Sequence, residues 1–413
     1  MTRHFPPGSG GGVQRPLKFA THLPALGIET HVLAPDVSGP APADEELELP
    51  THAWIHRVRY VGPGEGRPSE QLAAKQGSVA RVGTQAALLG RKLLVPDENA
   101  PWSTIATPVA IRLVRREGID VVLTTSPPPS LHLLGAAVKR TTSAAWVADL
   151  RDPLTSHPHR RGYESTLSLL KEKSVGGVGK LVASQADAIV AASDAIAEEM
   201  RSLEPKGAVV TIANGCDFDD FAGLEHHSSD RLRITHAGHF HGKRDPRPFL
   251  RALSASGLED VVVRFAGDFR AADREYADSL GLGDRLEFLG NLPRRRSLEL
   301  QRDSEALLLL VPESGGRGKG VVTGKIFEYL AAERPILAAV PPDGAAAELV
   351  RETGAGIVVP PDDVDALRDA LLDLHRRWQA GSLNGTPLSA EWRHKLSRSD
   401  RVEELADVLR SVV

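Results

Sequence analysis

The stretch GVVTGKIFEYLAAERPILAAV, residues 320–340, places a helix directly before a short apolar strand. It opens with glycine and small residues, continues in a helical pattern with Lys325 and Glu328 on one face, and ends in the apolar run PILAAV. A helix followed at once by a short, fully apolar strand is typical of a parallel sheet with crossover helices. The stretch therefore indicates an α/β fold.

The same alternation continues through almost the whole chain. Helical patterns fit between the apolar runs, and the first of them, residues 13–26, is expected to end at Gly27 as its C-cap. We therefore predict an α/β fold of two Rossmann-like, doubly wound halves with a change-over near residues 213–230. The predicted strands are residues 28–34, 54–61, 119–125, 144–150, 187–193, 207–213, 231–238, 261–267, 285–290, 305–311, 335–340 and 356–359.

The domain boundaries follow from this alternation. Residues 1–213 are predicted to form an N-terminal domain, joined by a C-terminal helix at residues 391–413, and residues 214–390 to form the second domain. The first strand of such a fold usually lies at the centre of its sheet, yet only three residues precede the loop HFPPGSGGGV. The first strand is therefore expected to be truncated: either it is very short, or the true start of the protein lies upstream, and we favour the second interpretation.

Composition excludes several classes of protein. A length of 413 residues suits two domains of roughly 200 residues each. The net charge of −4 gives no general reason to expect a nucleic-acid partner. Cys216 is the only cysteine, so no disulfide forms within the chain. No apolar run approaches the roughly 18 residues of a membrane span, and no signal peptide is visible. We expect a cytoplasmic globular protein.

The helix start at residues 323–328 has the features of a phosphate site. Thr323 is in position to cap the helix, and free backbone N–H groups beside Gly324 attract an anion together with the helix dipole. Lys325 adds a positive charge where the dipole disfavours one, which is favourable if a diphosphate binds there. Glu328 lies one turn further and can accept two hydrogen bonds from a vicinal diol. The pattern fits a nucleoside diphosphate; the alternative is a surface Lys–Glu pair.

Four segments together resemble glycosyltransferase family 4, the group 1 retaining glycosyltransferases of GT-B fold. They are FPPGSGGGVQRPLKFATHLPALG, IANGCDFDDF, THAGHFHGKRDP and the whole tail from GVVTGKIFEYL to PPDDVDAL, in the family's order. The segments VVLTTSPPPSLHLLG and VADLRDP are similar to the bacterial branch that builds cell-surface polysaccharides. The resemblance covers nearly the full chain.

This resemblance implies a retaining, metal-independent transfer of sugar from a nucleoside diphosphate sugar, with UDP as the expected nucleotide. The acceptor would be a glycan, a lipid-linked sugar or a small molecule in polysaccharide or glycoconjugate biosynthesis, and no cofactor is expected. The donor would bind the C-terminal domain and the acceptor the N-terminal domain. The alternatives are a sugar-nucleotide 2-epimerase of the same fold and a non-catalytic sugar-nucleotide-binding protein.

The resemblance also assigns donor-site residues. Glu328 would hold the ribose hydroxyls, and Leu292 would lie where the family's backbone contacts the nucleobase. The residues that would approach or neutralise the phosphates are Gly10, Gly11, Gly12, Gly238, Lys243, Arg244, Gly324 and Lys325. For Lys243 and Arg244 the alternative is a solvated basic loop, and for the glycine run it is a flexible turn.

Two departures from the family concern the donor sugar. The family commonly has a second glutamate eight residues before the position of Glu328, where this chain has Gly320; Glu313 is a candidate substitute at the wrong spacing. The family also often has a histidine after the strand at residues 119–125. Here Thr125 and Ser126 stand at that place, and His132 follows within the next helix, either facing the donor sugar or packing against the sheet.

Further polar residues have two interpretations each. Asp149, Arg151 and Asp152 end a strand, where ligands bind in open α/β sheets, so they are either acceptor or sugar contacts or a structural network. The basic segment at residues 75–94 either touches an anionic membrane surface or is an ordinary amphipathic helix. The three arginines at residues 294–296 are expected to solvate a helix start. His236, His239 and His241 lack an acidic or cysteine partner for a metal, so no metal site is predicted.

Overall fold

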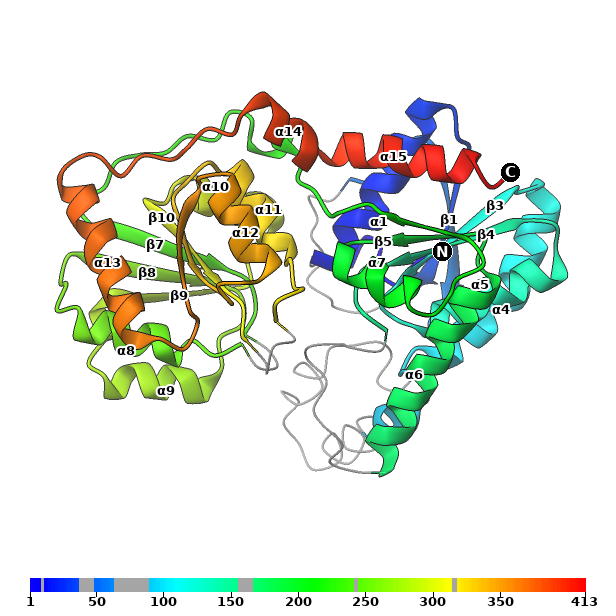
Figure 1. Ribbon diagram of the computed structural model, residues 1–413, viewed down its shortest axis with the longest axis horizontal. Helices are drawn as coiled ribbons and strands as arrows, with labels where there is room; N and C mark the ends of the chain where they lie inside the picture. The colour runs from blue at the N-terminus through cyan, green and yellow to red at the C-terminus, as the bar shows by residue number, and fades with distance from the viewer. Residues whose placement is uncertain (9–10, 37–47, 63–88, 155–165, 241–243, 314–317) are drawn as a thin grey trace. The chain divides into compact units, whose positions relative to one another are not determined.

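The computed structural model describes residues 1–8, 11–36, 48–62, 89–154, 166–240, 244–313 and 318–413. The chain divides into two compact units, both visible in Figure 1. The first unit contains Met1–Ala213 and Arg401–Val413, and the second contains Asn214–Asp400. Each unit is built on parallel β-strands connected by helices.

The first unit contains a two-stranded and a four-stranded parallel sheet, and the backbone of its first two residues joins them. Met1 donates to the Leu123 carbonyl at 2.7 Å and accepts from the Thr125 amide, while the Thr2 amide donates to the Leu33 carbonyl at 3.0 Å. Residues 1–2 thus lie between the two sheets, at the central position expected for a first strand. The sheets have the orders β1-β2 and β3-β4-β5-β6, formed by Thr30–Asp36, Ala53–Arg59, Val121–Ser126, Ala145–Leu150, Ala188–Ala191 and Ala208–Thr211.

Strand β4 shows how the interior of the first unit is packed. It is buried along its whole length: Trp146 and Leu150 pack with apolar residues of α6, whereas Val147 packs on the opposite face with residues of α1 and α15. This alternation follows from the two-residue repeat of a strand. The helices belonging wholly or mainly to this unit are Gly11–His22 (α1), Ala100–Glu117 (α4), Ser130–Thr141 (α5), Thr166–Gln185 (α6), Asp194–Arg201 (α7) and Arg398–Arg410 (α15).

Of two helix predictions, the one at residues 13–26 is confirmed with its C-cap, and the one at residues 391–413 is wrong in expecting a single helix. The helix expected at residues 13–26 is α1 followed by a 3-10 turn, and Gly27 ends it in the left-handed conformation with φ 77°. The single helix expected at residues 391–413 is two helices, Ala390–Leu396 (α14) and α15. They are separated because Ser397 is extended, with φ −63° and ψ 128°, and its hydroxyl accepts from the Asp400 amide at 3.4 Å.

The described residues of the second unit form a six-stranded parallel sheet in the order β12-β11-β10-β7-β8-β9. In chain order its strands are Leu232–Ala237 (β7), Val261–Ala266 (β8), Leu286–Gly290 (β9), Ala306–Leu310 (β10), Ile336–Ala339 (β11) and Gly356–Val359 (β12). Besides α14, its helical segments are Phe218–Phe221 (η3), Arg247–Ala255 (α8), Ala271–Ser279 (α9), Gly283–Arg285 (η4), Arg294–Arg302 (α10), Gly324–Ala331 (α11), Ala345–Glu352 (α12) and Val364–Gln379 (α13).

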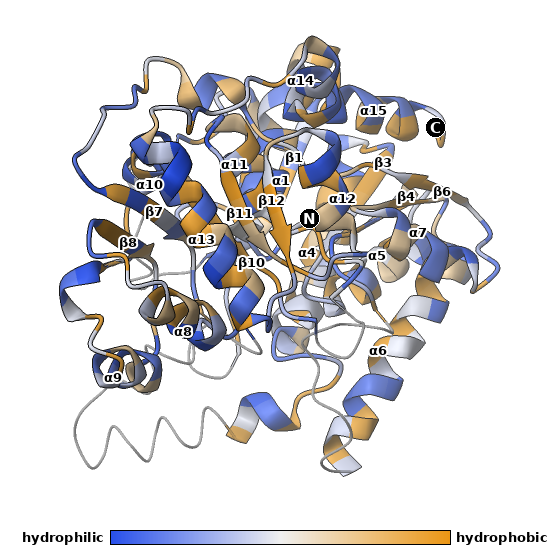
Figure 2. Ribbon diagram, turned by 60° about the vertical axis from the view of Figure 1, so that its left-hand side comes forward, coloured by the Kyte–Doolittle hydropathy of each residue, from blue (hydrophilic) through white to orange (hydrophobic). Residues whose placement is uncertain are grey.

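Apolar cores lie on both faces of this sheet. Ile234 and Leu308 belong to the core shared with α8 and α13, whereas Leu307 and Leu309 belong to the core shared with α11. Strands β10 and β11 are hydrophobic throughout in Figure 2, whereas α13 carries both kinds of residue. Burial on both faces explains why these strands read as continuous apolar runs. The predicted fold class of two doubly wound α/β halves is confirmed, and all twelve predicted strands overlap observed ones.

Candidate functional site

Two glycines, Gly238 and Gly267, directly follow β7 and β8, at the carboxyl ends of these strands. Gly238 (φ 135°) and Gly267 (φ 120°) adopt conformations that other residues rarely reach. A Cβ on Gly267 would lie 2.7 Å from the carbonyl group of Gly238, so the two backbones pack directly on each other. The carboxyl ends of parallel strands are where open α/β sheets bind their ligands.

Lys325, in the first turn of α11, lies directly on Gly238. A Cβ on that glycine would come within 1.9 Å of the lysine Cε and 2.4 Å of its Nζ. Removal from water, with the nearby charge of Arg244, lowers the pKa of Lys325 to about 7, although the Glu328 carboxylate acts in the opposite direction. No ion pair to Lys325 occurs among the described residues, so its charge is available to a ligand.

Arg244 is the second cation of this site and is only 5% exposed. It donates to two backbone carbonyls, from Nε to Leu310 at 3.1 Å and from Nη1 to His239 at 3.0 Å. Burial lowers the pKa of Arg244, and no carboxylate pairs with it in the described part of the chain. A buried cation without a counter-ion is electrostatically costly, and an anionic ligand would relieve that cost. Lys243, predicted beside it, lies outside the described residues.

The start of α11 differs in one respect from the prediction. Thr323 does occupy the N-cap position with an extended backbone, but its hydroxyl makes no capping hydrogen bond and is buried without a partner among the described residues. The first amides of α11 therefore lack the side-chain acceptor that the sequence suggested. A Cβ on Gly324 would meet no atom within 4 Å outside its own helix, so there is room beside this helix start.

Glu328, one turn along α11, is held in a network of charged groups. Its Oε1 accepts from Arg294 Nη1 at 2.7 Å, and Arg294 Nη2 donates to Asp220 Oδ2, also at 2.7 Å. Burial acts to lower the pKa of Arg294, but the two carboxylates outweigh it and raise the pKa. The expectation that the three arginines at residues 294–296 only solvate a helix start is therefore wrong for Arg294. Arg296, by contrast, is 71% exposed.

Two other residues considered in the sequence belong to this unit. Leu292 is partly buried in the loop between β9 and α10, two residues before Arg294. His236, on β7, is fully buried, and its Nδ1 lies 2.8 Å from the Leu308 carbonyl. In the described residues no group of three or more His, Cys, Asp or Glu side chains is arranged to hold a metal ion.

In the first unit, Asp149 belongs to a buried ion pair. Arg15 of α1 contacts both of its carboxylate oxygens, with a shortest distance of 2.8 Å, and the Thr125 hydroxyl donates to Oδ2 at 2.6 Å. Arg15 also donates to the carbonyls of Ile212 and Ala213, so the pair links α1, β3, β4 and the end of β6. The structure thus places Asp149 and Thr125 in a structural network whose arginine sequence reasoning missed.

Arg151 joins the beginning of α1 to the loop after β3. It donates to the carbonyls of Gly12 at 2.6 Å, Ser126 at 2.9 Å and Pro127 at 3.2 Å, and burial lowers its pKa. Gly12 packs closely, because a Cβ there would lie 3.3 Å from the His4 ring. The predicted residues Gly11, Ser126 and Asp152 lie in the same segments of the chain, at the start of α1, the end of β3 and the residue after Arg151.

His132 lies in the interior of the first unit, with no exposed surface. Its Nδ1 is 2.9 Å from the Thr124 hydroxyl, which also accepts from Trp146 Nε1 at 2.8 Å. Burial lowers the pKa of His132 to about 4, with Asp149 opposing the shift, so the ring is neutral at physiological pH. A ring packed in this way has no surface for a ligand, and we leave His132 out of the candidate site.

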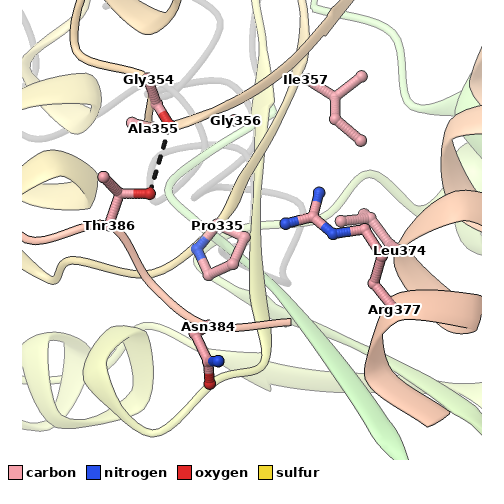
Figure 3. A pocket seen from close by; sticks show the side chains of 9 residues that line it. All are labelled: Pro335, Gly354, Ala355, Gly356, Ile357, Leu374, Arg377, Asn384 and Thr386. Atoms are coloured by element: carbon pink, nitrogen blue, oxygen red, sulfur yellow. Dashed lines mark hydrogen bonds between the residues drawn. The ribbon is translucent and has the colours of Figure 1, made fainter. Parts of the chain in front are cut away.

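The pocket in Figure 3 lies at the opposite ends of the strands of the second unit's sheet. Its lining includes Pro335 and Gly354, which precede β11 and β12, together with Thr386, whose hydroxyl donates to the Gly354 carbonyl at 3.4 Å. The pocket is therefore at the amino ends of the parallel strands, whereas Gly238 and Lys325 lie at their carboxyl ends. It is not part of the candidate site.

Two family models match the chain. The model described as Glycosyltransferase Family 4 matches residues 9–220, and the model described as Glycosyl transferases group 1 matches residues 231–377. No curated protein matches the chain. In the described residues no helix is long and apolar enough to span a lipid bilayer. The basic segment at residues 75–94 lies mostly outside the described residues.

Solved structures share the fold over nearly their full length. Sucrose-phosphate synthase from Thermosynechococcus elongatus aligns with a TM-score of 0.65 and 15% identity, over 96% of this chain and 92% of its own. Anabaena HepE in complex with UDP-glucose aligns with a TM-score of 0.65 and 15% identity, over 99% of this chain and 98% of its own. A glycosyltransferase from Rickettsia africae aligns with a TM-score of 0.64 and 15% identity, over 100% of this chain and 97% of its own. The shared architecture is the GT-B fold.

Proposed function

This chain belongs to glycosyltransferase family 4, and from that premise we propose that it is a retaining, metal-independent enzyme that uses a UDP-sugar. Family membership supports transfer of a sugar from a nucleotide sugar as the general activity. We propose a glycan, a lipid-linked sugar or a small molecule as the acceptor, in polysaccharide or glycoconjugate biosynthesis.

The observation that carries the proposal is the pair of cations, Arg244 and Lys325, at the carboxyl ends of the strands in the second unit's sheet. Within the described residues, Arg244 is buried with only backbone carbonyls as partners, and Lys325 lies on Gly238 without an ion pair. The amides at the start of α11 add partial positive charge at the same place. Preorganised positive charge of this kind stabilises a departing diphosphate in the transition state.

The nucleoside would extend along α11 from this phosphate site. Glu328 follows Lys325 by three residues, about 4.5 Å along the helix axis. Its carboxylate would accept hydrogen bonds from the two ribose hydroxyls, and the backbone near Leu292 would meet the base. This order of groups matches the order of a nucleoside diphosphate.

The reaction proposed is a same-face substitution at the anomeric carbon. The acceptor hydroxyl oxygen forms the new glycosidic bond while the bond from that carbon to the diphosphate breaks, and a phosphate oxygen takes the hydroxyl proton. Arg244 and Lys325 would balance the charge that develops on the diphosphate. Trapping of a glycosyl–enzyme adduct would contradict this single-displacement route.

A panel of nucleotide sugars tests the activity, beginning with UDP-glucose because a structure of HepE contains it. Transfer to an acceptor, or slow hydrolysis of the donor, is the expected result. Interconversion of UDP-N-acetylglucosamine and its 2-epimer would instead indicate an epimerase, and binding without turnover a non-catalytic protein. Each alternative would replace the proposed function.

Glu328→Ala tests the nucleotide assignment directly. Loss of two hydrogen bonds to a charged acceptor should weaken UDP binding by roughly 100-fold. Glu352→Ala, at an exposed position at the end of α12, is the matched control and should leave the affinity unchanged. Unchanged UDP affinity in Glu328→Ala, with a folded protein, would remove the ribose assignment.

A further inference from the structure

Arg294 connects two carboxylates that come from distant parts of the second unit. It is the first residue of α10, and its two terminal nitrogens each make a 2.7 Å contact, one with Glu328 of α11 and one with Asp220 of η3. The three side chains are only 16%, 22% and 24% exposed in the order Arg294, Glu328, Asp220. A partly buried pair of this kind is screened less than an exposed one.

The geometry of the guanidinium group restricts Glu328. A planar guanidinium with one nitrogen on each carboxylate has little rotational freedom, because turning it would break both contacts. Asp220 thus anchors Arg294 from the segment at residues 218–221, and Arg294 in turn anchors Oε1 of Glu328. The neighbouring Gln301 amide lies 3.5 Å from Oε2, at the limit of a hydrogen bond.

The contact with Arg294 leaves Glu328 able to bind a diol. An ionised carboxylate offers about four lone-pair sites, and Arg294 uses one of them. Even if Gln301 uses a second, two remain for two hydroxyl groups. The arginine therefore does not compete with a diol for the carboxylate; it sets the direction in which the remaining lone pairs point.

We propose that Arg294 is the positioning residue for recognition of the ribose diol, held in place by Asp220. This proposal rests on the proposed function, in which Glu328 accepts the ribose hydroxyls. Arg294 acts only through Glu328 and does not itself touch the nucleotide. Its removal should therefore reduce the contribution of the ribose hydroxyls to binding more than the contribution of the diphosphate.

Calorimetric titration of the full chain with UDP and with 2′,3′-dideoxy-UDP tests this. In the wild type, the loss of two hydrogen bonds to a charged acceptor should make UDP bind roughly 100-fold more tightly than the dideoxy analogue. In Arg294→Gln this ratio should fall below about 10-fold, and in Asp220→Asn it should fall by a smaller factor. Arg296→Gln is the control: it removes an exposed arginine from the same turn and should keep the wild-type ratio.

The outcomes separate the possible failures. If Arg294→Gln weakens both nucleotides by the same factor and keeps the ratio, the arginine is merely structural and the proposal is overturned. If the wild type binds both nucleotides equally, the ribose assignment of Glu328 fails, and this proposal fails with it. If the wild type binds no nucleotide, the proposed function itself is wrong. Arg294→Lys, which retains a cation, provides a second variant if Arg294→Gln does not fold, and its ratio should also fall because lysine lacks the planar fork.

Discussion

UDP binding should weaken as pH rises above 7, because Lys325 loses its proton there. In the free protein its pKa is lowered to about 7, by burial first and then by Arg244. A bound diphosphate favours the protonated amine, so the pKa of Lys325 should rise when UDP binds. Binding therefore takes up a proton, and by linkage the affinity must fall with increasing pH.

The size of the effect follows from the fraction of Lys325 that is protonated. With a pKa of about 7, that fraction is roughly one half at pH 7 and roughly one hundredth at pH 9. If only the protonated form binds UDP well, affinity should fall about 50-fold over this interval, or about 2.3 kcal/mol. At pH 8, binding should take up about 0.9 proton for each UDP bound. The terminal phosphate of UDP is mostly ionised at pH 7 and fully ionised at pH 9, so its own titration changes the affinity by less than about twofold.

Isothermal titration calorimetry measures both quantities. Titrations of UDP at pH 7, 8 and 9, at constant ionic strength and in two buffers of different ionisation heat, yield the affinity and the number of protons taken up. Lys325→Arg is the matched control, because a guanidinium stays protonated and should flatten the pH dependence to less than about twofold. Lys325→Met should bind weakly at every pH and take up no proton.

Two results would refute the reasoning. One is a wild-type affinity that is the same at pH 7 and pH 9, with no proton uptake. The other is an equal pH dependence in the wild type and Lys325→Arg, which would assign the titration to a different group. Either result would show that Lys325 is not the group whose proton uptake accompanies UDP binding, while leaving the family assignment in place.

Three further predictions concern packing. Gly238→Ala should weaken UDP binding in calorimetry and lower the free energy of unfolding in urea by about 1–3 kcal/mol, because the residue has a positive φ and lies against Lys325. Gly283→Ala is the control: a Cβ there meets no atom within 4 Å, so both quantities should stay unchanged. Asp149→Asn should cost about 3–5 kcal/mol in urea unfolding, because it removes the charge of one partner of the buried Arg15–Asp149 ion pair, whereas the exposed Asp365→Asn should cost less than about 1 kcal/mol. Burial raises the pKa of Cys216 to about 12, so its thiol should react with a disulfide reagent only after unfolding; rapid reaction in native buffer would contradict this.

The strands could be predicted because each one is a short apolar run between helical segments. Strand β4 is buried on every residue and β10 likewise, so their apolar character is continuous and visible in one dimension. The division of the C-terminal helix at Ser397 was not predicted, because serine is common both within and at the ends of helices. The two residues at the central position of the first unit, Met1 and Thr2, are too few to form a recognisable apolar run. Their place between β1 and β3 is known only from the structure.

The site was predictable where its residues are close in sequence and unpredictable where they are not. Lys325 and Glu328 share one helix turn, so their spacing was informative. The partners of Arg294 are 74 and 34 residues away, and Arg15 is 134 residues from Asp149. Side-chain pairs this far apart leave no local pattern, so these two arginines could be recognised only after folding had brought the segments together.

The two halves of the candidate site have opposite charge, and this polarity specifies the direction of the ligand. Arg244 and Lys325 make the beginning of α11 positive, whereas Arg294, Asp220 and Glu328 together carry a net negative charge one turn later. A diphosphate placed against the second group would meet carboxylates, and a diol placed against the first would leave two cations without a counter-ion. A nucleoside diphosphate satisfies both groups in only one orientation, with its phosphates at Lys325 and its ribose at Glu328. Neither a nucleoside alone nor free diphosphate satisfies both, so each should bind more weakly than the intact nucleotide.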